Sequence, residues 1–121
     1  MGGTQADLTK FFNEAINAFN HGQDMTPFLD ANATVYSISH QQAYTPQHAA
    51  ALYLKKQYQD HPKLTGMATS HTTLNTNGTG ATIQGTATWK DDHYPKGEDV
   101  IFCCTFVYKN NRWLFSTLWA S

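Results

Sequence analysis

The sequence predicts an α+β fold: a cone-shaped, curved antiparallel sheet packed on about three N-terminal helices. Three observations support this fold class. Helical patterns crowd the first half of the chain, whereas residues 81–89, 99–108 and 112–119 read as three long strands. The turn signal Asn77-Gly78 separates them from an earlier strand. Because one face of such a sheet needs cover, helices followed by strands indicate one layer of each.

The first predicted helix runs from about Thr4 to His21, and Gly22 stands where a C-terminal cap belongs. Its apolar residues recur at spacings of three and four, which places one stripe on one face: Leu8, Phe11, Phe12, Ala15 and Phe19. Thr26-Pro27 then begins a short second helix, anchored by Phe28 and Leu29.

The middle of the chain alternates strand and helix. Ala33–Ser39 reads as a strand, and Thr45-Pro46 opens a third helix that continues to about Gln59. Ala50, Leu54 and Tyr58 share one face of this helix, and His61-Pro62 ends it. A further strand covers Met67–Thr76. Along 81–89, small or apolar residues alternate with threonine and glutamine, so one face is predicted to be covered and the other exposed.

The last two strands carry large apolar side chains on both faces. Strict alternation places Trp113, Phe115 and Trp119 on one face, opposite Leu114 and Leu118. A sheet with a single covered face should instead alternate apolar and polar residues. The second face is therefore predicted to meet another molecule, most simply a second copy of the chain, which gives a homodimer through the outer sheet face.

The length and the charge of the chain limit the classes of partner that are expected. With 121 residues, the chain is predicted to be one domain, 1–121. Its net charge is −1 and its eight lysines and arginines are scattered, which argues against nucleic acid as a partner. No apolar run reaches membrane length and no targeting signal is recognisable, so the expected location is cytoplasmic, with no membrane partner. Cys103 and Cys104 should point to opposite faces of their strand.

The nine acidic residues fall in predicted helices, turns or strand ends. We therefore expect no buried carboxylate with a shifted pKa, and none at the base of a pocket. The loop at 91–98 and the adjoining Asp99 together gather acids around His93, but adjacent acids in a loop are more typical of solvated groups than of metal ligands. The sequence accordingly predicts neither a metal site nor a cofactor.

Abundant aromatic residues and small residues at 81–88 favour an apolar cavity inside the cone. The alternative is that the aromatic side chains simply fill it. If there is a cavity, a small hydrophobic molecule is the expected ligand, and hydroxyl groups would add polar contacts. The predicted ligand-binding residues are Phe12, Phe19, Ser37, Tyr53, Trp89, Cys104, Phe106 and Ser116.

The sequence resembles the nuclear transport factor 2-like superfamily. Its segment Phe19–Asp24 resembles that family's frequent end of the first helix, and Tyr108–Trp113 resembles its last hairpin. The resemblance covers nearly the whole chain and implies the same cone-shaped fold, in a branch similar to SnoaL-like cyclases and scytalone dehydratases. It also implies candidate activities, which can be compared with the residues present.

The resemblance places Ala15, Ser37 and Cys104 where ketosteroid isomerases carry their catalytic groups. Alanine and serine cannot shuttle a proton near neutral pH, so this activity is not expected. Compared with scytalone dehydratase, the catalytic histidines would fall near His71 and His93.

The dehydratase aspartate at the end of the first helix is replaced here by Asn20. Three functions therefore stay open. The first is a small-molecule-binding domain without assignable chemistry. The second is an acid–base isomerase, cyclase or dehydratase centred on His71, helped by His93, Asn20 and Tyr53. The third is a protein-interaction or dimerisation module. A lone strand histidine among threonines is also typical of an ordinary surface position.

Overall fold

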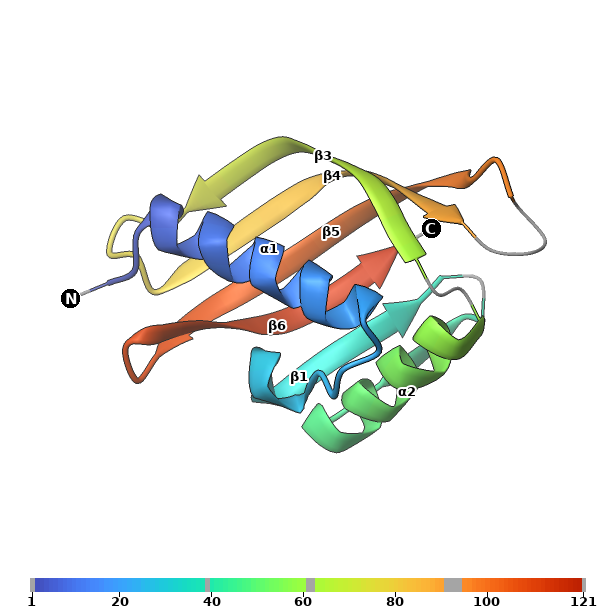
Figure 1. Cartoon of the computed structure of the whole chain (residues 1–121). Helices are drawn as coiled ribbons and strands as arrows, with labels where there is room; N and C mark the ends of the chain where they lie inside the picture. Colours follow the sequence, from blue (N-terminus) through green and yellow to red (C-terminus); the bar gives the residue numbers. More distant parts are fainter. Residues whose placement is uncertain (1, 39, 61–62, 91–94, 121) are drawn as a thin grey trace.

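The computed structural model describes residues 2–38, 40–60, 63–90 and 95–120, and the side chains of 63–70 and 120 lie outside this description. Helices cover one face of a long, curved sheet (Figure 1), which confirms the α+β cone. The elements, in chain order, are α1 (Gln5–Asn20), the 3₁₀ helix η1 (Thr26–Phe28), β1 (Leu29–Ser37), β2 (Gln42–Tyr44), α2 (Gln47–Asp60), β3 (Lys63–Leu74), β4 (Gly80–Lys90), β5 (Glu98–Lys109) and β6 (Arg112–Ala120).

Both ends of α1 are capped, the C-terminal end at Gly22 as predicted. The Thr4 side-chain oxygen accepts a hydrogen bond from the backbone N–H of Asp7 at 3.2 Å. At the other end, Gly22 has a φ of 68° and its N–H donates to the carbonyl of Phe19 at 3.0 Å. The next N–H, of Gln23, donates to the carbonyl of Ala18 at 3.0 Å. This pair of bonds is a Schellman motif, which requires the left-handed conformation that glycine adopts most easily.

The strand order in the sheet is β2-β1-β6-β5-β4-β3. Strand β1 runs parallel to β6, and the other neighbours are antiparallel. Strand β1 begins at Leu29, four residues before its predicted start at Ala33. Strand β3 begins at Lys63, four residues before its predicted start at Met67. The three-residue β2 was not predicted, because Gln42–Tyr44 has no apolar alternation. The predicted helix end at His61-Pro62 lies outside the described residues.

The inner face of the sheet follows the predicted alternation along β4. Ala81, Ile83 and Ala87 are buried under the helices, whereas Gln84 and Thr86 between them are exposed. The largest fully buried side chains of the core come from α1, β1, β4, β5 and β6: Leu8, Leu29, Ile83, Phe106 and Phe115. The core therefore lies between α1 and the inner face.

A β-bulge in β6 corrects the predicted faces of that strand. Phe106 pairs with Phe115 but the preceding Thr105 pairs with Thr117, so Ser116 is an extra residue in β6. The alternation reverses at this point. Leu118 then pairs with Cys104 on the inner face, and Trp119 pairs with Cys103 on the outer face. The prediction that Trp119 shares a face with Trp113 and Phe115 was therefore wrong, because one inserted residue shifts every later side chain to the other face.

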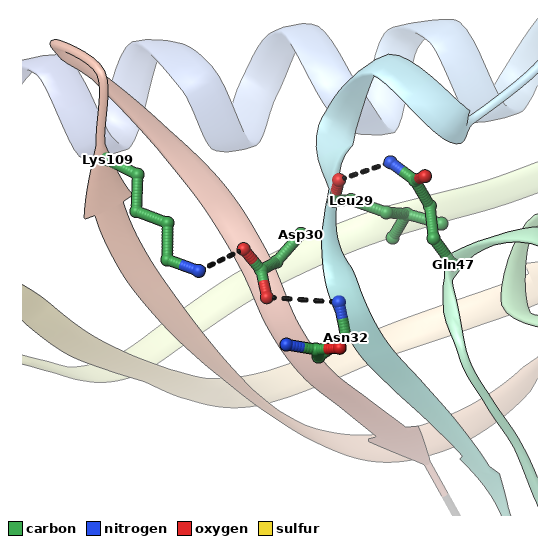
Figure 2. A network of polar contacts seen from close by, with 5 residues as sticks. All are labelled: Leu29, Asp30, Asn32, Gln47 and Lys109. Carbon is green, nitrogen blue, oxygen red and sulfur yellow. Dashed lines mark hydrogen bonds and ion pairs between the residues drawn. The ribbon is translucent and has the colours of Figure 1, made fainter.

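Asp30 corrects a second expectation, that no carboxylate is buried. It lies at the start of β1 with only 6% of its surface exposed. Figure 2 shows its two oxygens accepting from Lys109 Nζ at 2.7 Å and from the backbone N–H of Asn32 at 3.2 Å. The bond from Lys109, helped by that N–H, holds the pKa of Asp30 below its ordinary value of 3.8, although burial alone would raise it.

Within the described ranges, neither helix has the length and apolar character needed to cross a lipid bilayer.

Candidate functional site

A cavity of about 330 Å³ lies between the two helices and the inner face of the sheet. Its walls are mostly apolar and come from α1, the segment before η1, α2 and strands β1, β4, β5 and β6. The apolar wall residues are Phe12, Ala15, Ile16, Phe19, Met25, Val35, Leu54, Ala87, Trp89, Val100, Phe102, Phe115 and Leu118. The exposed aromatic residues Tyr36 and Trp119 also belong to the lining.

Small side chains leave this volume open. Ala15 on α1 and Ala87 on β4 both line the cavity, and they are 0% and 2% exposed. A methyl group fills far less space than the leucine or phenylalanine that core positions usually carry. Two such residues in the wall therefore leave room that the neighbouring side chains do not fill.

Aromatic packing fixes the walls around this space. The rings of Phe12 and Phe102 stack with centroids 5.9 Å apart, joining α1 to β5. Phe19, one α1 turn before the cap, packs edge-on against Trp89 of β4 at 5.7 Å and against Tyr58 of α2 at 6.2 Å. Such ring contacts add to the free energy of burial and hold each ring in one orientation. The apolar wall is therefore preformed.

Polar groups lie together on one side of the cavity. Ser37 at the end of β1, His40 in the turn after it, and Tyr53 and Gln57 on α2 all belong to the lining. The Ser37 hydroxyl accepts a hydrogen bond from the backbone N–H of His40 at 3.2 Å, which ties the turn to the strand end. His40 is exposed, so this polar side faces the opening.

Tyr53 is held by three neighbours. Its ring stacks on Tyr44 of β2 with centroids 3.9 Å apart and an interplanar angle of 11°. The ring of His40 meets it edge-on at 6.5 Å, and its hydroxyl oxygen accepts from Gln57 Nε2 at 2.6 Å. The short strand β2 thus has a role in the site, because it places the stacking ring. The Tyr53 hydroxyl proton remains available for a ligand that accepts a hydrogen bond.

The thiol of Cys104 also lines the cavity, from β5. It is 5% exposed, and burial, with a smaller contribution from neighbouring Cys103, raises the pKa of this thiol strongly. Cys104 is therefore a neutral wall residue at physiological pH, and not a thiolate nucleophile.

Six of the eight predicted ligand-binding residues lie in the cavity wall: Phe12, Phe19, Ser37, Tyr53, Trp89 and Cys104. The other two do not line it. Phe106 is on the inner face but only 2% exposed, packed between Phe11 and Phe115 in the core. Ser116 is the extra residue of the β6 bulge. Binding of a ligand by the six remains a prediction.

His71 and Asn20, the predicted catalytic residues that the structure describes, do not line the cavity. His71 lies on β3, next to Gln84 of β4, with an exposed side chain whose Nε2 is 2.7 Å from the Thr73 hydroxyl. Asn20 is half-buried at the end of α1 and is not among the lining residues. His93 lies outside the described residues. Catalysis by His71, with His93 and Asn20, stays a prediction.

Sequence reasoning missed His40, Gln57 and Glu98, which line the cavity. His40 follows a strand end in a turn that contains Gln41 at a φ of 52°. The serine three residues before it, Ser37, was the available signal, since a serine hydroxyl often accepts from a nearby turn N–H. Gln57 lies one α2 turn after Tyr53, so its contact follows from helical spacing.

Across the described ranges, no group of three histidine, cysteine or acidic residues is arranged to hold a metal ion.

Comparison with known proteins bears on the fold. No protein-family model matches the chain, and no curated protein matches it by sequence. Among solved structures, a variant of a protein called Rd1NTF2_05 aligns with a TM-score of 0.82 and 15% identity, over 98% of this chain and 100% of the other. An NTF-2-like protein of unknown function from Shewanella oneidensis aligns with a TM-score of 0.77 and 14% identity, over 96% and 97% of the two chains.

A domain of unknown function with a cystatin-like fold, from Nostoc punctiforme, aligns with a TM-score of 0.77 and 13% identity over 98% of this chain and 78% of that one. Identities this low show a shared fold and leave the function open. The chain therefore has the nuclear transport factor 2-like fold.

Proposed function

We propose that the protein binds a small, mainly apolar molecule in the cavity between α1, α2 and the inner face of the sheet. The observation that carries the proposal is the cavity itself: about 330 Å³, walled mainly by apolar side chains, with a polar cluster of Ser37, His40, Tyr53 and Gln57 in its lining. Ligand sites in proteins are typically about 300–1,000 Å³ and combine apolar walls with a few placed polar groups.

The lining suggests the shape of the ligand. An apolar body would fill the space beside Ala15 and Ala87, where each buried Å² of apolar surface contributes about 25 cal/mol. A polar end would lie toward the opening, where the exposed lining residues His40 and Glu98 offer polar partners in place of lost water contacts. A single compact molecule with one polar end fits this arrangement.

Fluorescence of the neutral probe N-phenyl-1-naphthylamine tests the proposal, since its emission rises in an apolar site. The matched variants are Ala87→Leu, which fills the cavity from β4, and Thr86→Leu, which places the same leucine side chain on the exposed outer face. We expect the wild type and Thr86→Leu to bind the probe, and Ala87→Leu to bind it at least tenfold more weakly with its unfolding still cooperative. Equal binding by all three proteins contradicts the proposal.

A second candidate function is self-association through the outer sheet face. Tyr36, Ile101 and Trp119 are 44%, 62% and 39% exposed, on strands β1, β5 and β6. Tyr36 and Trp119 also border the cavity, whereas Ile101 does not. Register supports grouping them, since Trp119 pairs with both Tyr36 and Cys103. Large apolar side chains gathered on a sheet face favour a partner that covers them. A second copy of the chain supplies such a face by symmetry.

A further inference from the structure

We propose that the cavity selects ligands that carry one positive charge, an amine or a quaternary ammonium group, whose charged end lies at the opening between Glu98 and Trp89. This inference rests on the proposed function and specifies the class of molecule bound. It depends on three features: the register that brings these two residues together, the charges of the lining, and the aromatic ring beside the carboxylate.

The register of β4 and β5 places Glu98 at the cavity. Glu98 pairs directly with Trp89, so their side chains emerge on the same face of the sheet. Val100, two residues further along β5, is buried on that inner face, and its partner Ala87 is buried too. Glu98 is exposed and belongs to the lining, so its carboxylate lies where the cavity opens to water.

The charges of the lining are one-sided. Among the lining residues within the described ranges, Glu98 is the single acid, and no lysine or arginine is present. Deeper in the cavity, the walls offer aromatic and aliphatic groups and the neutral thiol of Cys104. A charged ligand group would have to stay at the opening, since an ion without a partner is too costly to bury. There it meets a carboxylate, which attracts an ammonium group and repels a carboxylate.

The indole of Trp89 adds a second attraction for a cation. Tryptophan is the side chain whose ring face attracts cations most strongly. Trp89 is half-buried, and the edge-on contact with Phe19 at 5.7 Å holds its ring in place. An ammonium group beside Glu98 would therefore lie close to an oriented aromatic ring.

These two attractions set the expected size of the preference. An exposed ion pair contributes about 0.2–1 kcal/mol, and an exposed cation–π contact about 0.5–1 kcal/mol. Together they correspond to a preference of roughly three- to thirtyfold for a cation over a neutral ligand of the same shape. The same field should weaken binding of an anionic ligand relative to the neutral one.

The test uses three probes with one skeleton: 4-phenylbutylamine, 4-phenyl-1-butanol and 4-phenylbutyrate. Their affinities are measured at pH 8 by displacement of N-phenyl-1-naphthylamine. We expect the amine to bind three- to thirtyfold more tightly than the alcohol, and the carboxylate most weakly.

Glu98→Gln and Asp99→Asn are a matched pair of variants. Each removes one negative charge, at adjacent positions on opposite faces of β5. The Asp99 carboxylate accepts from the Thr88 hydroxyl at 3.1 Å and belongs to the outer face. Glu98→Gln should abolish the preference for the amine and leave the alcohol unchanged. Asp99→Asn should retain the preference.

The outcomes separate this inference from the proposed function. Equal binding of the three probes overturns the charge selectivity and leaves the apolar cavity standing. An equal loss of the preference for the amine in both variants also overturns the charge selectivity. In that case the general negative field, and not a contact with Glu98, would be responsible for the preference. If no probe displaces the dye and the dye itself does not bind, the proposed function fails, and the inference fails with it.

Discussion

Lys109 Nζ lies 2.7 Å from Asp30 Oδ1, although 79 residues separate the two in the chain. The bond joins the start of β1 to the end of β5, at the hairpin that leads into β6. Gln47 ties down the same region, since its Nε2 donates to the carbonyls of Thr26 and Leu29 at 3.2 and 2.9 Å. These contacts fix how η1 and β1 enter the sheet.

Replacing Asp30 with asparagine should destabilise the fold by about 1–3 kcal/mol, because it removes a charge-assisted bond to a buried acceptor. Urea unfolding monitored by tryptophan fluorescence measures the change. Glu14→Gln, on an exposed face of α1, is the control and should change the free energy of unfolding by no more than about 0.5 kcal/mol. Similar effects of both substitutions would mean that the ion pair contributes nothing beyond an ordinary surface charge.

The lowered pKa of Asp30 also predicts an acid-sensitive component of stability. A carboxyl group whose pKa is lower in the folded than in the unfolded chain stabilises the fold above the unfolded value, here 3.8. That contribution is lost as the pH falls through the folded value. The wild type should therefore lose more unfolding free energy than Asp30→Asn between about pH 5 and pH 2. Parallel pH profiles for the two proteins would contradict this assignment.

Cys104 should be unreactive in the folded protein, because it is buried and its raised pKa keeps the thiol neutral. In a Cys103→Ser background, labelling with a thiol reagent at pH 8 should be at least about a hundredfold slower than in urea, since unfolding must expose the thiol. Cys104→Ser provides the comparison for Cys103 on the outer face. Rapid labelling of folded Cys103→Ser would show that the cavity wall opens to water.

A charge introduced into the exposed apolar group on the outer face should weaken self-association of the protein. Trp119→Lys places a charge in the centre of the exposed apolar group on that face, so sedimentation should show a shift from dimer toward monomer. Gln23→Lys adds the same charge in an exposed loop and should leave the assembly unchanged. A wild-type protein that sediments as a monomer at micromolar concentration would contradict the second candidate function.

Much of the fold could be predicted from the sequence, because the signals were local. The stripe of α1, the glycine at position 22 and the alternation along β4 each follow from spacing within a few residues. The bulge at Ser116 could not be predicted in this way. It is defined only by pairing with β5, so it appears when two distant strands are aligned.

The candidate site was predicted in its apolar part and missed in its polar part. Aromatic and small residues mark a cavity by composition, as Phe12, Phe19 and Trp89 illustrate. No feature of composition indicates that His40 and Glu98 line the cavity. Their place at the cavity depends on a turn held by Ser37 and on the register between β4 and β5. Buried Asp30 was missed for the same reason, since its partner Lys109 is remote in sequence.

The most direct test of ligand binding in the cavity is a titration with N-phenyl-1-naphthylamine followed by backbone amide NMR. We predict that the largest chemical-shift changes fall at the inner-face residues Val35, Ala87, Val100 and Leu118. Changes confined to the outer face, around the paired residues Thr86 and Ile101, would place the probe on the exposed face and contradict binding in the cavity.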